Sequence, residues 1–321
     1  MSPADPYFHS AKFDEIKGNA KLPECLYHYT TQAGLLGILD SGALWATKIQ
    51  HLNDSREFIL SIDIAKESLR KRQKQKHNNS CKCFFETVLS NIASIESANI
   101  CSISFCEDDD LLSQWRGYAG GSTGFSIGFH TEHLVKKTET LGHRIMRCIY
   151  NESDQVQIIN ELIDNAIEKI NQHGLNIDND STDRLALGSA NSFELSIVRY
   201  GAFFKHVSFK DENEWRVITD PISVSDPNFK FRPGKSTITP YYTLELVNKI
   251  DINGNKVNDV WFPIIEKIVI GPCPHESLSR QSVTGLIYKY YVSNSHDSLH
   301  EDYHARTMKY IENSKIPFRD W

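Results

Sequence analysis

Two carboxylates and a guanidinium stand close together in the stretch 210–219, which reads KDENEWRVIT. An acidic turn runs there into a strand-like segment, and side chains alternate between the two faces of a strand. Glu212, Glu214 and Arg216 therefore share one face, while Trp215 takes the other. A neighbouring guanidinium favours the charged form of a carboxylate. The pattern predicts either a structural ion pair beside a buried tryptophan or an ionised carboxylate that lines a functional cleft.

Further candidate residues come from two earlier segments of the chain. His28 stands in the β-rich run 26–30, where it is either hydrogen-bonded within a strand or in contact with a ligand. Trp115 and Tyr118 are three residues apart on a predicted helix, so they share a face that belongs to the core or to a pocket. The polar and aromatic candidates of this middle segment are Ser104, Trp115, Arg116 and Tyr118.

No metal site is predicted from the ligand-type residues. The thirteen histidines are scattered without ligand spacing, and the seven cysteines include no Cys-x-x-Cys pair, so we expect reduced thiols. Folding could still gather His28, Asp54, Glu57 and Glu214 into the site of a metal-dependent hydrolase or nuclease, and that alternative stays open.

A mixture of strands and helices must position these residues. The sequence predicts a lead-in segment over 1–25 and one α+β domain over 26–321, with a central, mostly antiparallel sheet and a helical insert around 152–209. Residues 221–240 contain four prolines and are predicted to be an extended, turn-rich connection. The predicted strands are 26–30, 44–47, 100–105, 124–129, 144–150, 214–219, 241–247 and 260–270. The predicted helices are 32–39, 54–76, 84–95, 111–118, 156–170, 185–204 and 277–290.

The composition narrows the class of protein. A net charge of -6 over 321 residues argues against a protein that coats nucleic acid. The basic run 70–76 is either a solvated helix face or a patch that contacts phosphate or RNA. No apolar run approaches the about 20 residues needed to cross a bilayer, and the N-terminus lacks the regions of a signal peptide. We therefore expect a cytoplasmic protein with no membrane partner.

Several motifs resemble the bacterial family known as domain of unknown function 2971, over most of residues 26–319. The opening of that family is similar to LYHYT at 26–30, ILxxGxL at 38–44 and LNDxxE at 52–57. Its middle and later segments are similar to SFC at 104–106, LLxxWxxYA at 111–119, GFSIGF at 124–129, ExEWR at 212–216, IGP at 270–272 and SxIPFR at 314–319.

A superfamily-level resemblance to ADP-ribosyltransferases rests on a strand histidine followed by Tyr and Thr, and on a late glutamate at a strand entrance. It implies an NAD-using transferase or NAD glycohydrolase, with a protein or nucleic acid as acceptor and a bacterial toxin or phage-defence effector as the setting. By this resemblance Glu214 is catalytic, and the NAD-binding residues are His28, Tyr29, Thr30, Ser104, Trp115, Tyr118 and Arg216.

The chemistry of that reaction suits the carboxylate. Breaking the nicotinamide–ribose bond builds positive charge on the ribose, as in glycoside hydrolysis, and an ionised carboxylate stabilises that charge in the transition state. The alternative from another class is a non-enzymatic nucleotide-sensing or interaction module, in which Glu214 and Arg216 form a structural pair.

Overall fold

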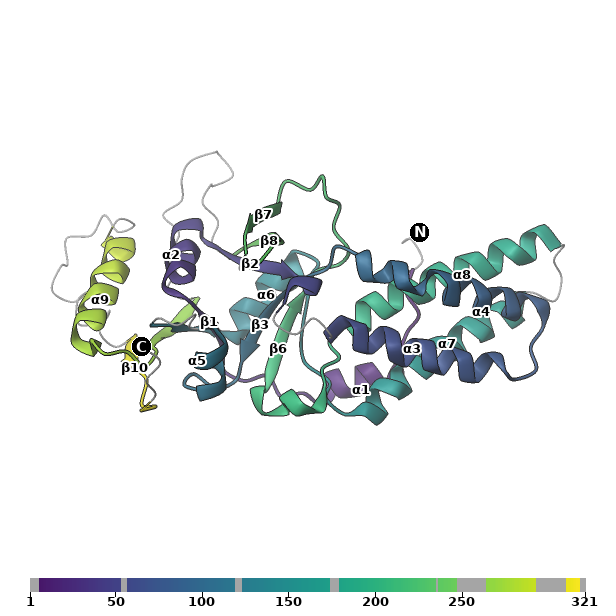
Figure 1. The fold of residues 1–321 in the computed structure, drawn as a ribbon, viewed down its shortest axis with the longest axis horizontal. Helices are drawn as coiled ribbons and strands as arrows, with labels where there is room; N and C mark the ends of the chain where they lie inside the picture. Colours follow the sequence, from purple (N-terminus) through teal and green to yellow (C-terminus); the bar gives the residue numbers. More distant parts are fainter. Residues whose placement is uncertain are drawn as a thin grey trace.

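The structure is a computed structural model that describes residues 6–52, 57–118, 123–173, 179–234, 236–246, 264–292 and 310–317 of the chain. Within these ranges a ten-stranded sheet lies beside a bundle of helices (Figure 1). The predicted α+β class is confirmed, because most strand pairs are antiparallel and the two longest helices lie together at one end of the molecule.

The helices are α1 (Ala11–Asn19), α2 (Gln32–Ser41), α3 (Glu57–Gln73), α4 (Asn79–Asn91), α5 (Leu112–Tyr118), α6 (Thr131–Thr140), α7 (Glu152–His173), α8 (Asn179–Gly201) and α9 (Glu276–Val292). Short 3₁₀ turns cover Ile49–His51, Ile92–Ser97 and Val207–Glu212. None of the described helices is long and apolar enough to cross a membrane.

The strands are β1 (Cys25–Thr30), β2 (Ala43–Lys48), β3 (Cys101–Cys106), β4 (Phe125–His130), β5 (Arg144–Arg147), β6 (Glu214–Ile218), β7 (Phe229–Pro233), β8 (Ile238–Glu245), β9 (Ile265–Ile270) and β10 (Ile311–Asn313). The main path of the sheet runs β10-β9-β4-β1-β3-β2-β8-β7, and β6 joins β3 and carries β5. Only the β9–β10 pair is parallel among the described strands.

Two strands, β1 and β2, share one edge of β3 and separate from each other along it; this gap in strand pairing is called the parting. Along its other edge, β3 pairs with β6 from Ser102 to Cys106. On the parting edge, Cys106 lies opposite Tyr27 of β1, while Ser102 lies opposite Thr47 of β2. The described residues provide no strand partner for residues 103–105 at this edge, so β1 and β2 diverge on either side of Ser104.

A helical bundle made by α1, α3, α4, α7 and α8 extends from the end of the sheet that carries β6 (Figure 1). The helices predicted within 152–209 are confirmed as α7 and α8. They pack against α3 and α4 around a common apolar core, and so form a wall beside the sheet. That core reaches the sheet through Met146 of β5 and Ile218 of β6.

Two segments contain regular structure that the sequence did not predict. The lead-in forms α1, because Ser10 caps the helix and Phe13 buries its ring against Tyr200 at a centroid distance of 4.6 Å. The connection 221–240 contains β7 and the start of β8. Its prolines are tolerated because β7 is an edge strand, and because β8 pairs with β2 only from Tyr241 onward.

Other local predictions are confirmed. The Thr31 hydroxyl accepts the backbone N–H of Gly34 at 3.1 Å and caps α2, which ends before Gly42 as expected. The glycine-rich strand β4 makes the expected close approach, since a Cβ at Gly128 would lie 2.7 Å from the Tyr27 ring. The predicted start of α3 at 54–56, the predicted strand residues 247 and 260–263, and Ala119 lie outside the described residues.

Candidate functional site

Glu214 lies at the centre of a buried cluster of charges. Its side chain is 5% exposed, and it follows the 3₁₀ turn Val207–Glu212 at the start of β6. Arg216 donates Nε to Oε1 at 2.8 Å and Nη2 to Oε2 at 3.0 Å. Lys205, which follows α8, donates Nζ to Oε2 at 2.5 Å and also to Glu212 at 2.6 Å. Both oxygens of the Glu214 carboxylate are therefore engaged by cations.

The neighbouring cations determine the ionisation of the Glu214 carboxyl group. Burial by itself would raise the pKa of Glu214, but the guanidinium of Arg216 and the ammonium of Lys205 outweigh it and lower that pKa to about 2. The remaining contacts tie the cluster to the backbone, because Arg216 Nη1 donates to the Ala202 carbonyl at 3.0 Å. Glu214 is thus an ionised carboxylate that holds the end of the helical bundle against the sheet.

The strand registers place His28 and Glu214 on opposite faces of the sheet. Glu214 lies opposite Cys106, and Cys106 lies opposite Tyr27, so these three side chains share a face. His28 follows Tyr27 and points to the other face, where its ring lies 5.8 Å from that of Phe105. The structure therefore does not bring the first-strand histidine and the late glutamate together.

His28 of β1 lies at the parting, next to the unpaired edge of β3. Its Nδ1 lies 3.0 Å from the Ser104 carbonyl oxygen, an atom at the unpaired edge of β3. Burial lowers the pKa of His28, and nearby Arg232 lowers it further against the opposing effect of the bond to Ser104. The ring is therefore neutral, and because the carbonyl can only accept, Nδ1 carries the proton. Nε2 is left with a lone pair that can accept a hydrogen bond.

The opposite side of the parting carries a guanidinium stacked on aromatic rings. Arg232 of β7 lies with its guanidinium carbon 5.5 Å from the ring centroid of Trp45 and 5.7 Å from that of Tyr241. Its Nη2 donates to the Thr47 hydroxyl at 2.9 Å. Thr47 lies opposite Ser102, on the face that carries Glu214, so Arg232 lies on the opposite face from His28.

Tyr29 and Trp115 form a small internal cluster with their polar atoms engaged. The Tyr29 hydroxyl donates to the Asp108 carbonyl at 2.8 Å and accepts the Leu111 N–H at 2.9 Å. Trp115 Nε1 donates to Asp110 at 2.8 Å, and its ring meets that of Tyr29 edge-on at 4.7 Å. These two residues hold the segment that precedes α5 in place. Trp115 therefore belongs to the core and not to a pocket, the first of the two predicted alternatives.

The other predicted site residues are partly exposed. Ser104 is half-buried on the face of Glu214, and Thr30 is half-buried on the face of His28, with its hydroxyl against Gly34. Tyr118 is half-buried and packs against the Tyr29 and Trp115 cluster. The metal-dependent alternative is not assembled, because His28 and Glu214 lie on opposite faces; Asp54 and the side chain of Glu57 lie outside the described residues.

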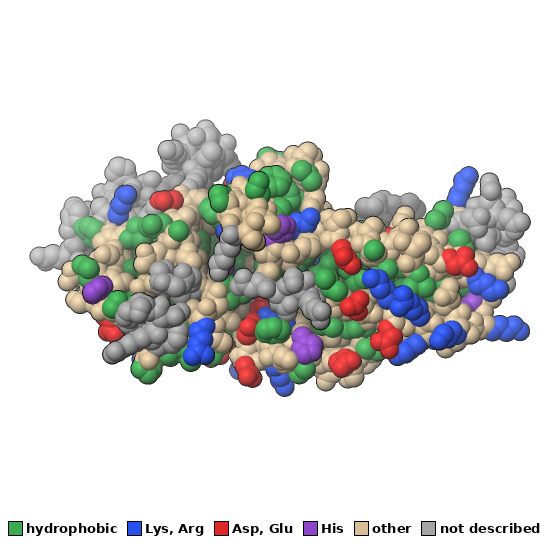
Figure 2. Space-filling view, viewed as in Figure 1, with side chains coloured by type: hydrophobic (Ala, Val, Ile, Leu, Met, Phe, Trp, Pro, Cys, Tyr) green, Lys and Arg blue, Asp and Glu red, His purple; other side chains and the backbone are tan. Residues whose placement is uncertain are grey.

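The surface of the helical bundle mixes both signs of charge. Figure 2 shows basic and acidic side chains interspersed over this half of the molecule. Within the basic run 70–76, Lys71 pairs with Glu67 at 2.7 Å and Arg72 pairs with Asp164. These pairs favour the solvated helix face over a phosphate- or RNA-contacting patch.

A pocket of about 430 Å³ opens between α2 and α9. Leu35 and Leu36 of α2 line one side, and Leu278 and Val283 of α9 line the other. The described wall of this pocket contains none of the predicted site residues.

The family model for the protein of unknown function DUF2971 matches residues 114–217. The predicted resemblance to that family is confirmed over this part of the chain, which includes most of α5, the helices α7 and α8, and the Glu214 cluster. No curated protein and no solved structure matches the chain. The resemblance to ADP-ribosyltransferases stays a prediction.

Sequence reasoning missed several residues of this region. Lys205 lies just after the predicted helix 185–204, within the helical insert around 152–209, and Arg232 lies in a segment predicted to be a connection. Trp45 and Tyr241 were placed on the predicted strands 44–47 and 241–247, which the structure makes partners as β2 and β8. The strand that carries Arg232 could have been predicted, because aromatic and basic residues alternate in FKFRP at 229–233, which is typical of a short edge strand.

Proposed function

We propose that the protein binds a nucleotide, with NAD as the first candidate, where β1 and β2 part beside Ser104. The observation that carries this proposal is the half-buried His28, held by the Ser104 carbonyl at 3.0 Å with its second nitrogen free to accept. A strand edge without a partner strand leaves backbone polar groups that a ligand can satisfy.

His28 supplies the contact to a ribose. A neutral imidazole that donates through Nδ1 accepts through Nε2, and the hydroxyl groups of a ribose are donors. The bond to Ser104 fixes both the tautomer and the orientation of the ring, so the acceptor is oriented before the ligand arrives.

Arg232 supplies the contact to phosphate. A guanidinium is planar, always charged and able to bind phosphate oxygens through two parallel bonds. The rings of Trp45 and Tyr241 hold it in place, and one of its five donors already goes to Thr47. A ribose acceptor at His28 and a phosphate donor at Arg232 would match two parts of a dinucleotide.

Cleavage of the bound NAD, by ADP-ribosyl transfer or by hydrolysis, is the catalytic form of this proposal. It requires a carboxylate near the ribose carbon that becomes charged. Glu214 is an ionised carboxylate, but it lies on the opposite face from His28 and both of its oxygens are engaged. The geometry therefore supports the nucleotide-binding module better than the transferase with Glu214 as its catalytic residue.

Calorimetric titration of the full chain with NAD, ADP-ribose and ATP tests the proposal. We expect NAD binding that weakens at least about tenfold, or about 1.4 kcal/mol, in both His28→Ala and Arg232→Ala. Lys230→Ala is the matched control, because Lys230 is an exposed cation on the same strand as Arg232. It should leave the dissociation constant unchanged.

The same samples distinguish the remaining functions. Release of nicotinamide by the parent chain, or labelling of an added protein or nucleic acid, would establish the catalytic form and its acceptor. Metal-dependent cutting of nucleic acid without NAD binding would favour the hydrolase alternative. A folded parent chain that binds none of the three nucleotides at about 1 mM, an affinity of about -4 kcal/mol, would refute the proposal.

A further inference from the structure

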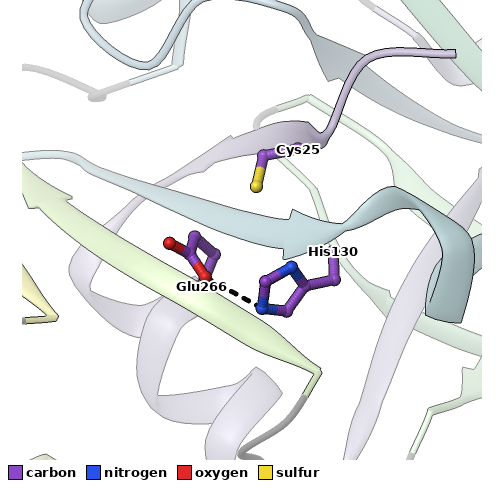
Figure 3. A group of neighbouring side chains, drawn as sticks. All are labelled: Cys25, His130 and Glu266. Carbon is purple, nitrogen blue, oxygen red and sulfur yellow. Dashed lines mark ion pairs between the residues drawn. The ribbon is translucent and has the colours of Figure 1, made fainter.

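Three metal-ligand side chains meet on neighbouring strands at the far end of β1 from the parting. Cys25 begins β1, His130 ends β4 and Glu266 lies near the start of β9. A ligand atom of each lies within 4.8 Å of the others, and His130 Nε2 lies 2.8 Å from Glu266 Oε2. Figure 3 shows the thiol, the imidazole and the carboxylate pointing toward one another from three different strands.

The register of the sheet creates this group. Cys25 lies directly opposite His130, so their side chains share a face. Between β4 and β9 the register shifts, because Gly128 pairs with Lys267 while Phe129 pairs with Ile265. Glu266 is therefore the extra residue of a β-bulge.

The bulge has a direct effect on where Glu266 points. In an unbroken ladder Glu266 would lie opposite Phe129, whose side chain is buried in the apolar core. With the bulge, Ile265 takes that core position and Glu266 turns to the side of His130. A bulge that re-aims a polar side chain in this way is typical of functional positions in sheets.

We propose that Cys25, His130 and Glu266 form a binding site for a divalent transition metal, with Zn²⁺ as the ion that fits these donors best. Thiolate, imidazole and carboxylate are the three ligand types that Zn²⁺ takes in proteins. Bonds of about 2.0–2.3 Å to a tetrahedral ion place its ligand atoms roughly 3.3–3.8 Å apart, so the side chains need to move by only about 1 Å. Binding releases the thiol proton of Cys25 to solvent.

The fourth position of the ion is open to water. His133 lies nearby on α6, with its ring centroid 6.1 Å from that of His130, but it is exposed and stands outside the convergent group. Three protein ligands with an open position are the arrangement of zinc sites that bind a further small ligand.

Metal titration of the full chain tests this proposal. Chain stripped of metal by a chelator is titrated with Zn²⁺ in competition with a chromogenic chelator, and with Co²⁺ while the absorption spectrum is recorded. We expect one ion per chain, a thiolate-to-cobalt charge-transfer band, and at least about a tenfold loss of affinity in Cys25→Ser and in His130→Ala.

Two variants serve as controls. Cys83→Ser removes a half-buried thiol on α4 and should leave binding and the cobalt spectrum unchanged. His133→Ala should also keep the affinity, and a loss equal to that of His130→Ala would overturn the open fourth position. A folded parent chain that takes up no Zn²⁺, uptake that survives Cys25→Ser, or a cobalt spectrum without the thiolate band would overturn the site.

Discussion

Replacing Glu214 by glutamine removes the negative charge from the centre of the buried cluster while keeping the size of the side chain. The cations of Arg216 and Lys205 then stay buried without the carboxylate that compensates them. Breaking a buried ion pair by removing one partner costs about 3–5 kcal/mol, because the remaining charge cannot regain its hydration.

The lowered pKa of Glu214 gives a similar value for its contribution to the free energy of unfolding. A carboxyl group whose pKa falls from 4.5 to about 2 on folding adds about 3 kcal/mol to the free energy of unfolding at neutral pH. Because the folded-state pKa is lowered, this stability is fully present above pH 4.5 and is lost as the pH falls toward 2. We therefore expect Glu214→Gln to lose about 3 kcal/mol at pH 7 and to lose progressively less below pH 4.5.

Urea denaturation of both chains between pH 7 and pH 3 measures this difference. Glu212→Gln is the matched control, because Glu212 contacts the same lysine at 2.6 Å but its side chain is 23% exposed. Its pair with Lys205 is reached by solvent, so we expect it to cost about 1 kcal/mol or less. A Glu214→Gln chain within about 1 kcal/mol of the parent at pH 7, or a difference independent of pH, would refute the structural role of the cluster.

Three further outcomes follow from the geometry of β1 and its surroundings. Tyr29→Phe removes a hydroxyl that bonds two backbone groups, so urea denaturation should show a loss of about 1–3 kcal/mol; no loss would contradict this assignment. Gly34→Ala places a Cβ 1.9 Å from the Thr30 hydroxyl and should cost about 1–3 kcal/mol, most of which Thr30→Ala in the same chain should restore. Burial lowers the pKa of His28, so its imidazole should titrate below 6.5 by NMR, and the fall in stability as the pH drops below 6.5 should be smaller in His28→Asn than in the parent.

Much of the fold could be predicted because its signals are local. The strand 26–30, the cap at Thr31 and the helix that ends before Gly42 all follow from residues adjacent in the chain. The two long helices α7 and α8 follow in the same way from apolar periodicity. The sequence did not predict helix α1 or the edge strand β7. Helix α1 depends on the packing of the Phe13 ring, and β7 depends on its pairing with another strand, and neither can be read from adjacent residues.

By itself, the sequence determined that Glu214 and Arg216 share a face and that Trp215 takes the other, because a strand has a period of two residues. Only the tertiary structure decided that His28 lies on the opposite face, since this depends on the register of β1 and β6 with β3. The tertiary structure alone also decided that Lys205 lies beside Glu214.

The group of Cys25, His130 and Glu266 is also a product of tertiary structure. These residues are more than 100 positions apart in the chain, so no spacing motif could indicate them. A strand register and one bulge bring them together, and a shift of one residue would turn any of these side chains to the other face.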